Sequence, residues 1–414
     1  MRKRQPNRWL IAVVSCLSNL CLGVNYAWSV VAGPLAERLS EVNHFTGAAA
    51  LSASDLAIVF ALTNAIMPIP MILGGAVNDR RGPREIVFVG GALFGIGLLL
   101  TGQFTSVGGL IFAYSILVGL GNGLVFTCTV NNTVKFFPDR KGLIGGLTTA
   151  SYGLGSIVFA PIAQALIDKS GVSNTLKVFG IIVLVVICVG ALFLAKAPET
   201  PKVTTPANNA AVKTGAELNW HQMLGRPIFY IMLLLLACGA LQGQLIISHA
   251  SAVAQEMVGL TATTAALVVS LVSGSNAFGR LLCGYASDKL GRVNVIAIAI
   301  TLSLIGLILL YFSSQVGVAA LVIGVCLVGL CFGCFMGVYP GFTADRFGIR
   351  NNSLNYGVMM LGNSIGAIAG PGIMSSMHSS TGSFRSAFLI AASLALAGIV
   401  LTFIYRAMAR KESR

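Results

Sequence analysis

Residues 271–292 read LVSGSNAFGRLLCGYASDKLGR, and this stretch decides the fold. It begins as an apolar helix, carries Arg280 in the middle of that helix, and ends in a polar turn around Asp288. At about 1.5 Å per residue, Arg280 lies about 12 Å from Asp288, near the centre of a bilayer core of about 30 Å. A cation at that depth costs at least ~2.5 kcal/mol unless it faces water or a partner. Arg280 therefore indicates a functional site; the alternative is an arginine that reaches the membrane surface or forms a structural pair.

The composition is that of a membrane protein built from helices. Of 414 residues, 56% are hydrophobic and only 10% are charged, whereas a soluble domain holds about 25% charged residues. The 48 glycines suit close packing of helices in a bilayer. The nine cysteines fall in apolar runs and are interpreted as small hydrophobic residues. Cys331 and Cys334 have CxxC spacing but lack a second ligand pair, so no metal site is predicted.

Apolar segments along the chain predict twelve membrane spans. They lie near residues 8–32, 54–77, 84–104, 107–134, 141–165, 174–196, 225–254, 261–286, 293–313, 317–341, 352–376 and 383–406. The polar stretch Ala197–Leu224 is interpreted as a linker. We therefore expect a six-helix bundle over 1–196, a cytoplasmic linker over 197–224, and a second six-helix bundle over 225–414.

The distribution of basic residues predicts the orientation. Most of the 27 Lys and Arg residues lie at the termini, in the linker or in the even-numbered loops. Those on the opposite side are Arg38, Lys169, Lys177 and Arg385. The positive-inside rule then places both termini in the cytoplasm. The net charge of +14 is explained by this topology and by anionic lipid, so nucleic acid is not an expected partner.

The two halves repeat each other. Residues 75–84 (GAVNDRRGPR) and 284–292 (GYASDKLGR) share the pattern Gly-x-x-x-Asp-Arg/Lys-x-Gly at an offset of 209 residues. Each is a tight turn whose Asp is able to lie near a helix end. The residues of these turns that we expect to act in gating are Gly75, Asp79, Arg80, Gly284, Asp288, Lys289 and Arg292.

This repeated turn resembles the signature of the major facilitator superfamily, over the whole chain. The resemblance implies an all-α membrane protein with twelve transmembrane helices in two pseudo-symmetric bundles. It also implies a cavity at the midplane that opens alternately to the two sides of the membrane.

Within that superfamily, the chain is more similar to the monocarboxylate and oxalate:formate transporter family. The matching segments are Asn7–Trp9, Gly23–Trp28 with Pro34, Phe137–Gly142, Tyr152–Gly155, Asn276–Arg280 and Asn355–Gly357. Oxalate carriers of the family place a lysine where Asn363 stands here. Mammalian monocarboxylate carriers place an aspartate where Asn276 stands.

The distribution of charged residues in the membrane interior limits the classes of substrate that we expect. All thirteen Asp and Glu residues map to loops or to the ends of spans, so Arg280 has no carboxylate at its own depth. A buried guanidinium without a counter-ion suits a carboxylate that the substrate brings. A second substrate carboxylate would stay unpaired in a medium of low dielectric constant, which is unfavourable. We therefore expect a small monocarboxylate of the lactate or pyruvate type; a neutral substrate with a polar head is the alternative.

The resemblance also suggests which residues surround the substrate. The polar and aromatic residues on the stretches that border the cavity in this fold are Tyr26, Trp28, Asn122, Phe126, Tyr152, Phe332, Phe335, Tyr339 and Asn363. Aromatic walls with polar tips suit a molecule of a few carbons; lipid contact or packing is the alternative for each. Asn276, one turn from Arg280, is predicted to bind a substrate hydroxyl or carbonyl, or else to form an interhelical hydrogen bond.

Entry of a lone anion against a negative-inside potential costs about 2.3 kcal/mol per 100 mV, whereas an anion with a proton is electroneutral. We therefore expect proton symport, with His249 or a carboxylate bound at Arg280 as the proton site. His249 is also a candidate to bind the substrate as a hydrogen-bond donor. A helix–helix hydrogen bond with a structural role is the alternative for this residue. Exchange of oxalate, formate or another organic anion is the alternative to symport.

Other classes of function are disfavoured. A membrane enzyme needs a nucleophile with a base, or grouped metal ligands, and neither is present at one depth. A sensor on this fold would be expected to carry an added signalling domain. We expect no cofactor, a functional monomer, and a location in the cytoplasmic membrane of a bacterium.

Overall fold

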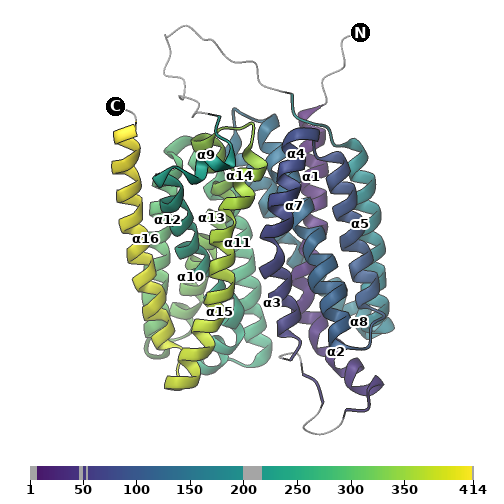
Figure 1. Ribbon diagram of the computed structural model, residues 1–414. Coiled ribbons are helices and arrows are strands. Elements are labelled where there is room, and N and C mark those ends of the chain that lie inside the picture. The colour runs from purple at the N-terminus through teal and green to yellow at the C-terminus, as the bar shows by residue number, and fades with distance from the viewer. Residues whose placement is uncertain (1–6, 46–49, 53–54, 199–216, 413–414) are drawn as a thin grey trace.

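The computed structural model describes residues 7–45, 50–52, 55–198 and 217–412. Every regular element in these ranges is a helix. The helices stand side by side, and α1 begins at the same end of the molecule at which α16 finishes (Figure 1). The positive-inside rule assigns this end to the cytoplasm, and we call it the cytoplasmic end.

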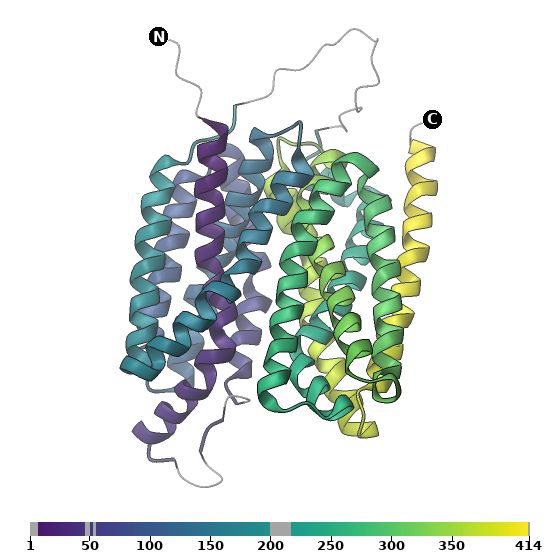
Figure 2. The same cartoon turned by 180° about the vertical axis from the view of Figure 1, so that it is seen from behind.

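The first half of the chain forms the helices on one side of the molecule (Figures 1 and 2). They are α1 (Arg8–Leu22), η1 (Gly23–Ala27), α2 (Trp28–Val42), α3 (Ala57–Ile66), α4 (Pro68–Arg81), α5 (Arg84–Thr101), α6 (Val107–Leu110), η3 (Ile111–Val118), α7 (Gly119–Phe136) and α8 (Lys141–Phe193). The first span is longer than the predicted range 8–32. It reaches Val42 because η1 continues the helix as a 3-10 turn that leads into α2.

The second half forms the helices on the other side (Figures 1 and 2). They are α9 (Trp220–Leu224), α10 (Pro227–Val258), α11 (Ala262–Leu290), α12 (Arg292–Val316), α13 (Val318–Phe347), α14 (Asn352–Met359), α15 (Leu361–Thr381) and α16 (Arg385–Glu412). The short α9 lies inside the predicted linker. Residues 199–216 of that linker lie outside the described residues, so the three-part division of the chain stays a prediction.

Helix α8 contains two crossings of the membrane. Its 53 residues would extend about 80 Å as one straight helix, far beyond the thickness of a bilayer core. The chain reverses at Gly171, whose φ of 77° and ψ of 163° are not helical. Eleven continuous helical segments in the described ranges are long and apolar enough to cross a membrane, and α8 supplies two of the twelve predicted spans.

The outer surface of these helices is apolar. Leu73, Ile368 and Phe403 are each more than 60% exposed, on three different helices. Such surfaces are unfavourable in water and match the hydrocarbon core of a membrane. The predicted all-helical membrane fold is therefore confirmed, and the chain is an integral, multi-pass membrane protein.

Candidate functional site

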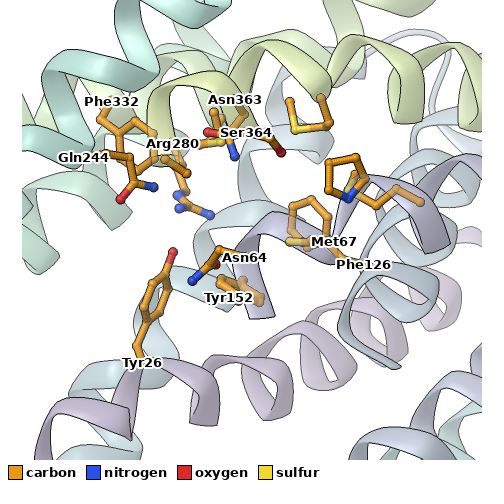
Figure 3. Close-up of a pocket in the computed structure, with 15 residues that line it drawn as sticks. Tyr26, Asn64, Met67, Phe126, Tyr152, Gln244, Arg280, Phe332, Asn363 and Ser364 are labelled. Carbon is orange, nitrogen blue, oxygen red and sulfur yellow. The ribbon is translucent and has the colours of Figure 1, made fainter. Parts of the chain in front are cut away.

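A cavity lies between the two halves of the chain (Figure 3). Its walls come from both halves. From the first half they include Tyr26, Asn64, Met67, Pro68, Met71, Phe126 and Tyr152, and from the second half Gln244, Arg280, Phe332, Met336, Met360, Asn363, Ser364 and Ala367. Most of these side chains are apolar or aromatic, and a few polar groups converge among them, which is typical of a site for a small molecule.

Arg280 projects into this cavity from α11 (Figure 3). The residue is only 2% exposed. Its Nε donates a 2.8 Å hydrogen bond to Oδ1 of Asn276, one turn earlier on the same helix. Its Nη1 donates a 2.9 Å hydrogen bond to the backbone carbonyl of Thr149 on α8. Both partners are neutral, so neither compensates the positive charge of the guanidinium.

Arg280 is the one charged side chain among the described residues that line the cavity. A guanidinium has five N–H donors. The two printed hydrogen bonds engage Nε and Nη1, and no described residue accepts a hydrogen bond from Nη2. The cavity therefore presents a buried positive charge with donor groups left for an anion.

Polar groups also come from the walls around Arg280. The hydroxyl of Tyr152 accepts a 3.1 Å hydrogen bond from Asn122, and the Tyr152 ring centroid lies 6.0 Å from the Arg280 guanidinium carbon. Tyr26 packs edge-on against Tyr152, with 5.1 Å between ring centroids. In the same lining, Oδ1 of Asn363 is buried without a hydrogen-bond partner among the described residues. An unpaired buried acceptor is costly unless a ligand or water supplies a donor.

The structure brings six of the predicted residues together at the cavity surface. These are Tyr26, Phe126, Tyr152, Arg280, Phe332 and Asn363. Asn276 and Asn122 lie directly behind this surface, where they hold Arg280 and Tyr152 respectively. Asn276 therefore makes the hydrogen bond within its helix rather than facing the cavity.

The remaining predicted residues lie outside the lining. Trp28 packs on Tyr114, at 4.3 Å between ring centroids, and Phe335 packs on Tyr339, at 5.8 Å. The hydroxyl of Tyr339 donates to the carbonyl of Met232.

His249 also lies outside the lining. Its Nδ1 lies 2.7 Å from the hydroxyl of Ser248, and its Nε2 lies 3.1 Å from the hydroxyl of Ser375 on α15. The contact with Ser375 links α10 to α15.

Several lining residues were not predicted from the sequence. Asn64 on α3 and Gln244 on α10 are polar residues in the middle of apolar spans, which is the signal that identified Arg280. The methionines Met67, Met71, Met336 and Met360 carry no such signal, because methionine is common throughout membrane helices.

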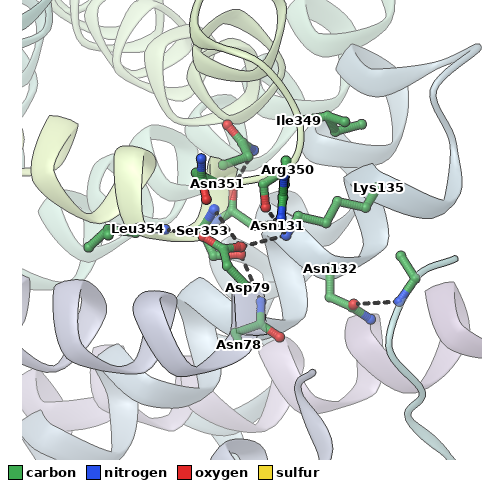
Figure 4. A network of polar contacts seen from close by, with 12 residues as sticks. Asn78, Asp79, Asn131, Asn132, Lys135, Ile349, Arg350, Asn351, Ser353 and Leu354 are labelled. Carbon is green, nitrogen blue, oxygen red and sulfur yellow. Dashed lines mark hydrogen bonds and ion pairs between the residues drawn. The ribbon is translucent and has the colours of Figure 1, made fainter. Parts of the chain in front are cut away.

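A network of polar contacts joins the two halves at the cytoplasmic end (Figure 4). The carboxylate of Asp79, at the end of α4, accepts hydrogen bonds from the backbone N–H groups of Ser353 and Leu354 in the first turn of α14. It also pairs with Lys135 at 2.5 Å. At Gly75, an added Cβ would lie 2.5 Å from the carbonyl oxygen of Ser353, so only glycine permits this approach.

The second turn of the repeat makes the corresponding contact. The carboxylate of Asp288, at the end of α11, accepts 2.8 Å hydrogen bonds from the backbone N–H groups of Gly142 and Leu143 in the first turn of α8. Arg292 pairs with both Asp288 and Asp345, at 2.7 and 2.8 Å.

Each repeat thus places a carboxylate on a helix N-terminus of the opposite half, where the helix dipole favours negative charge. Lys289 and Arg80, the basic residues that directly follow Asp288 and Asp79 in the sequence, make contacts of different kinds. The ammonium of Lys289 lies 4.6 Å from the ring centroid of Tyr285 on its own helix. The backbone carbonyl of Arg80 accepts a hydrogen bond from Lys196.

Comparison with known proteins decides the family. The family profile of the Major Facilitator Superfamily matches residues 8–285 and 250–414, which together cover nearly the whole chain. The chain belongs to the major facilitator superfamily. It is therefore a membrane transporter and not an enzyme, as predicted.

Relatives within the superfamily include transporters of small organic anions. The chain is 31% identical to the uncharacterised MFS-type transporter YhjX of Escherichia coli (strain K12), over 88% of this chain and 87% of that protein. It is 27% identical to the oxalate:formate antiporter of Oxalobacter formigenes, over 98% and 93%. It is 28% identical to monocarboxylate transporter 11 of Homo sapiens, over 87% and 76%.

Solved structures of the superfamily share the fold. The proton:xylose symporter XylE superposes with a TM-score of 0.75 at 18% identity, covering 96% of this chain and 95% of that one. At this identity the likeness establishes the fold alone.

Proposed function

We propose that this protein is a secondary active transporter of a small monocarboxylate, of the lactate or pyruvate type. The observation that carries the proposal is Arg280, a buried cation in the cavity wall whose hydrogen-bond partners are neutral. A carboxylate is the ligand that best matches the planar fork of a guanidinium. The names of two relatives, a monocarboxylate transporter and an oxalate:formate antiporter, are consistent with such a ligand.

The balance of charge favours one carboxylate over two. The described lining of the cavity contains one cation and no Lys, His, Asp or Glu. One substrate carboxylate beside Arg280 makes a neutral pair. A second carboxylate would be desolvated without a partner, which costs several kcal/mol in a medium of low dielectric constant. Asn363, which also lines the cavity, offers only an amide.

The fold and the two Asp contacts support transport by alternating access. Asp79 and Asp288 each hold a helix N-terminus of the opposite half at the cytoplasmic end. Separation of these contacts would open the cavity toward the cytoplasm, while closure of the halves at the other end would seal it. We propose that the gating residues of the two turns act in this way, with the protein working as a monomer in the cytoplasmic membrane of a bacterium.

We further propose that transport is coupled to protons. The described cavity lining holds no carboxyl group that would carry a proton. The proton therefore travels on the substrate carboxylate beside Arg280, or binds at His249, which contacts Ser375 outside the lining. In either case one anion and one proton cross together, so the cycle moves no net charge.

The experiment that tests the function is uptake into proteoliposomes that contain the purified protein. Labelled lactate is offered outside, and unlabelled lactate, pyruvate, acetate, formate and oxalate compete with it. We expect lactate accumulation under an acid-outside gradient, with monocarboxylates competing better than oxalate. Preferential transport of oxalate, or absence of carboxylate uptake in active vesicles, would contradict the proposal.

The second candidate function is exchange of oxalate, formate or another small anion. It is favoured by the similarity to the oxalate:formate antiporter, which extends over nearly the full length of both chains. Exchange requires a substrate on both sides of the membrane. Uptake that appears only in vesicles preloaded with an anion would therefore identify an exchanger, whereas uptake into empty vesicles under a proton gradient identifies a symporter.

A further inference from the structure

Arg280 joins the two halves of the protein. Its helix, α11, belongs to the second half, whereas the carbonyl of Thr149 that accepts its Nη1 bond belongs to α8 in the first half. Asn276 fixes Nε from behind, so the guanidinium is held in the orientation that reaches Thr149. The residue expected to bind substrate is therefore also a hydrogen-bonded tie between the halves.

This tie is part of a continuous contact between α8 and α11, which run side by side (Figure 2). On α11, Arg280, Gly284 and Asp288 follow one another at intervals of one helical turn. Gly284 packs against the backbone of α8, where an added Cβ would collide with the carbonyl oxygen of Gly142. Asp288 then holds the first turn of α8 at the cytoplasmic end.

We propose that the Arg280–Thr149 hydrogen bond is a latch that the substrate carboxylate releases. This inference rests on the proposed function, because it needs a carboxylate at Arg280. The carbonyl of Thr149 is a neutral acceptor, whereas a substrate carboxylate is a charged one, and charge-assisted hydrogen bonds are roughly twice as strong. A bound carboxylate therefore draws the guanidinium toward the cavity and away from Thr149.

The release has a direct consequence for gating. Without substrate, the latch adds to the Gly284 and Asp288 contacts and keeps the cytoplasmic end closed. With substrate, the seam between α8 and α11 loses the hydrogen bond between Arg280 and Thr149. A ligand that binds better to the state with the latch broken shifts the population toward that state, and hence toward opening. The empty carrier is thereby biased against opening to the cytoplasm.

Hydrogen–deuterium exchange of the purified full-length protein tests the latch, because Gly142 and Leu143 donate their amide hydrogens across the seam. Peptides that cover residues 140–153 are followed with and without L-lactate, pyruvate, acetate, formate and oxalate. Binding of each acid is measured in parallel by calorimetry. We expect each acid that binds to accelerate exchange in these peptides by about two-fold or more, whereas simple ligand stabilisation would slow it.

A pair of glycine variants on α11 separates the latch from general loosening. Gly284→Ala should force α8 and α11 apart, raise exchange at 140–153 without any acid, and abolish most of the acid effect. Gly274→Ala is the matched control, because an added Cβ there meets nothing within 4 Å. It should behave like the unchanged protein. Peptides over residues 352–356, at the Asp79 contact, report whether opening in Gly284→Ala is confined to the α8–α11 seam.

The possible results are distinguishable. Acids that bind without changing exchange at 140–153, or that slow it, would overturn the latch and leave the proposed function standing. A normal acid effect in Gly284→Ala would also overturn it. If none of the five acids binds, the proposed function fails together with the latch.

Discussion

A buried arginine in this protein forms hydrogen bonds with two neutral partners. Arg280 is hydrogen-bonded to an amide oxygen and to a backbone carbonyl, and both are weaker acceptors than a carboxylate. These hydrogen bonds stabilise the guanidinium enough to keep it at this depth, but they leave its positive charge without a counter-ion. An incoming carboxylate therefore gains both hydrogen bonds and charge pairing, which is the chemical basis of the proposed binding.

Arg280→Lys should strongly reduce transport although it keeps the positive charge. A lysine lacks the planar fork, so it loses the bidentate contact and the hydrogen bond from Nε to Asn276. One lost charge-assisted hydrogen bond of about 1.5–3 kcal/mol corresponds to a decrease of roughly 10- to 100-fold in the rate of lactate uptake at low concentration. Arg385→Lys is the control and should transport normally, because Arg385 lies at the end of the protein away from the cytoplasm. Near-normal uptake by Arg280→Lys at a matched protein level would argue against the anchor.

Asn363→Lys should change the charge of the preferred substrate. The amide lies in the lining of the cavity that contains Arg280, with its Oδ1 unpaired, so a lysine there adds a second cation to the site. We expect oxalate to compete with lactate better in the variant than in the unchanged protein. Asn363→Gln keeps the amide and serves as the control. A variant that still transports lactate with the same ratio of lactate to oxalate affinity would contradict this reading.

The side chains of the site could largely be predicted from the sequence, but the backbone groups that contact them could not. Arg280 is predictable because a cation in an apolar span is rare, and Tyr26, Phe126 and Asn363 follow from the family resemblance. The carbonyl of Thr149 has no counterpart in the sequence, because every residue carries one. Which carbonyl faces Arg280 depends on how α8 packs against α11, and only the structure provides that.

At the cytoplasmic end, the two halves are held together at the N-termini of α14 and α8. Each of these N-termini donates hydrogen bonds to a carboxylate of the opposite half. Asp79→Ala would remove two hydrogen bonds to α14 and the partner of Lys135. We expect faster deuterium exchange of residues 352–356, because Ser353 and Leu354 lose their acceptor. Loss of an interaction between a carboxylate and a helix N-terminus costs about 0.5–2 kcal/mol, so the acceleration should be about two- to thirty-fold.

Asp139→Ala is the matched control for this prediction. Asp139 also lies at the cytoplasmic end, but its pair with Arg8 is about half exposed on both sides, and such surface pairs contribute little. Exchange at 352–356 should therefore stay unchanged. Equal effects of the two substitutions would show that the Asp79 contact has no special part in holding the halves.

The boundaries of elements were predictable to different degrees. Spans with a polar turn at each end, such as α12, match the sequence prediction closely. The first span was predicted to end near residue 32 but continues to Val42, because the chain passes through η1 without a break. At Gly23 an added Cβ would lie 2.5 Å from Cα of Gly155, so this turn is shaped by contact with α8. Such a contact between distant segments is not visible in local sequence.

At the scale of the whole molecule, the cavity lies between two halves that are joined at the cytoplasmic end. In the proposed mechanism, this arrangement separates the site that recognises the anion from the contacts that open the carrier. The α8–α11 seam connects them, since it contains both Arg280 and Asp288. We therefore propose that binding and opening are linked through this one pair of helices.

His249→Gln tests where the proton is carried. If His249 is the proton site, the variant should lose most of the lactate accumulation driven by an acid exterior but keep exchange of lactate for lactate, which needs no net proton movement. His221→Gln, on α9 at the cytoplasmic end, is the control. Equal loss of accumulation and exchange would make His249 a structural or binding residue, consistent with its contacts to Ser248 and Ser375. Uptake that builds an inside-negative potential and ignores the pH gradient would contradict symport itself.

The central claim is that Arg280 binds the carboxylate of the substrate. Calorimetric binding of L-lactate and of its neutral analogue lactamide, to the unchanged protein and to Arg280→Gln, measures that contact most directly. We predict that the unchanged protein prefers lactate and that Arg280→Gln removes this preference, because a buried charge pair that loses one partner costs about 2–5 kcal/mol. If Arg280→Gln weakens lactate and lactamide equally, or leaves the preference for lactate intact, Arg280 does not bind the carboxylate.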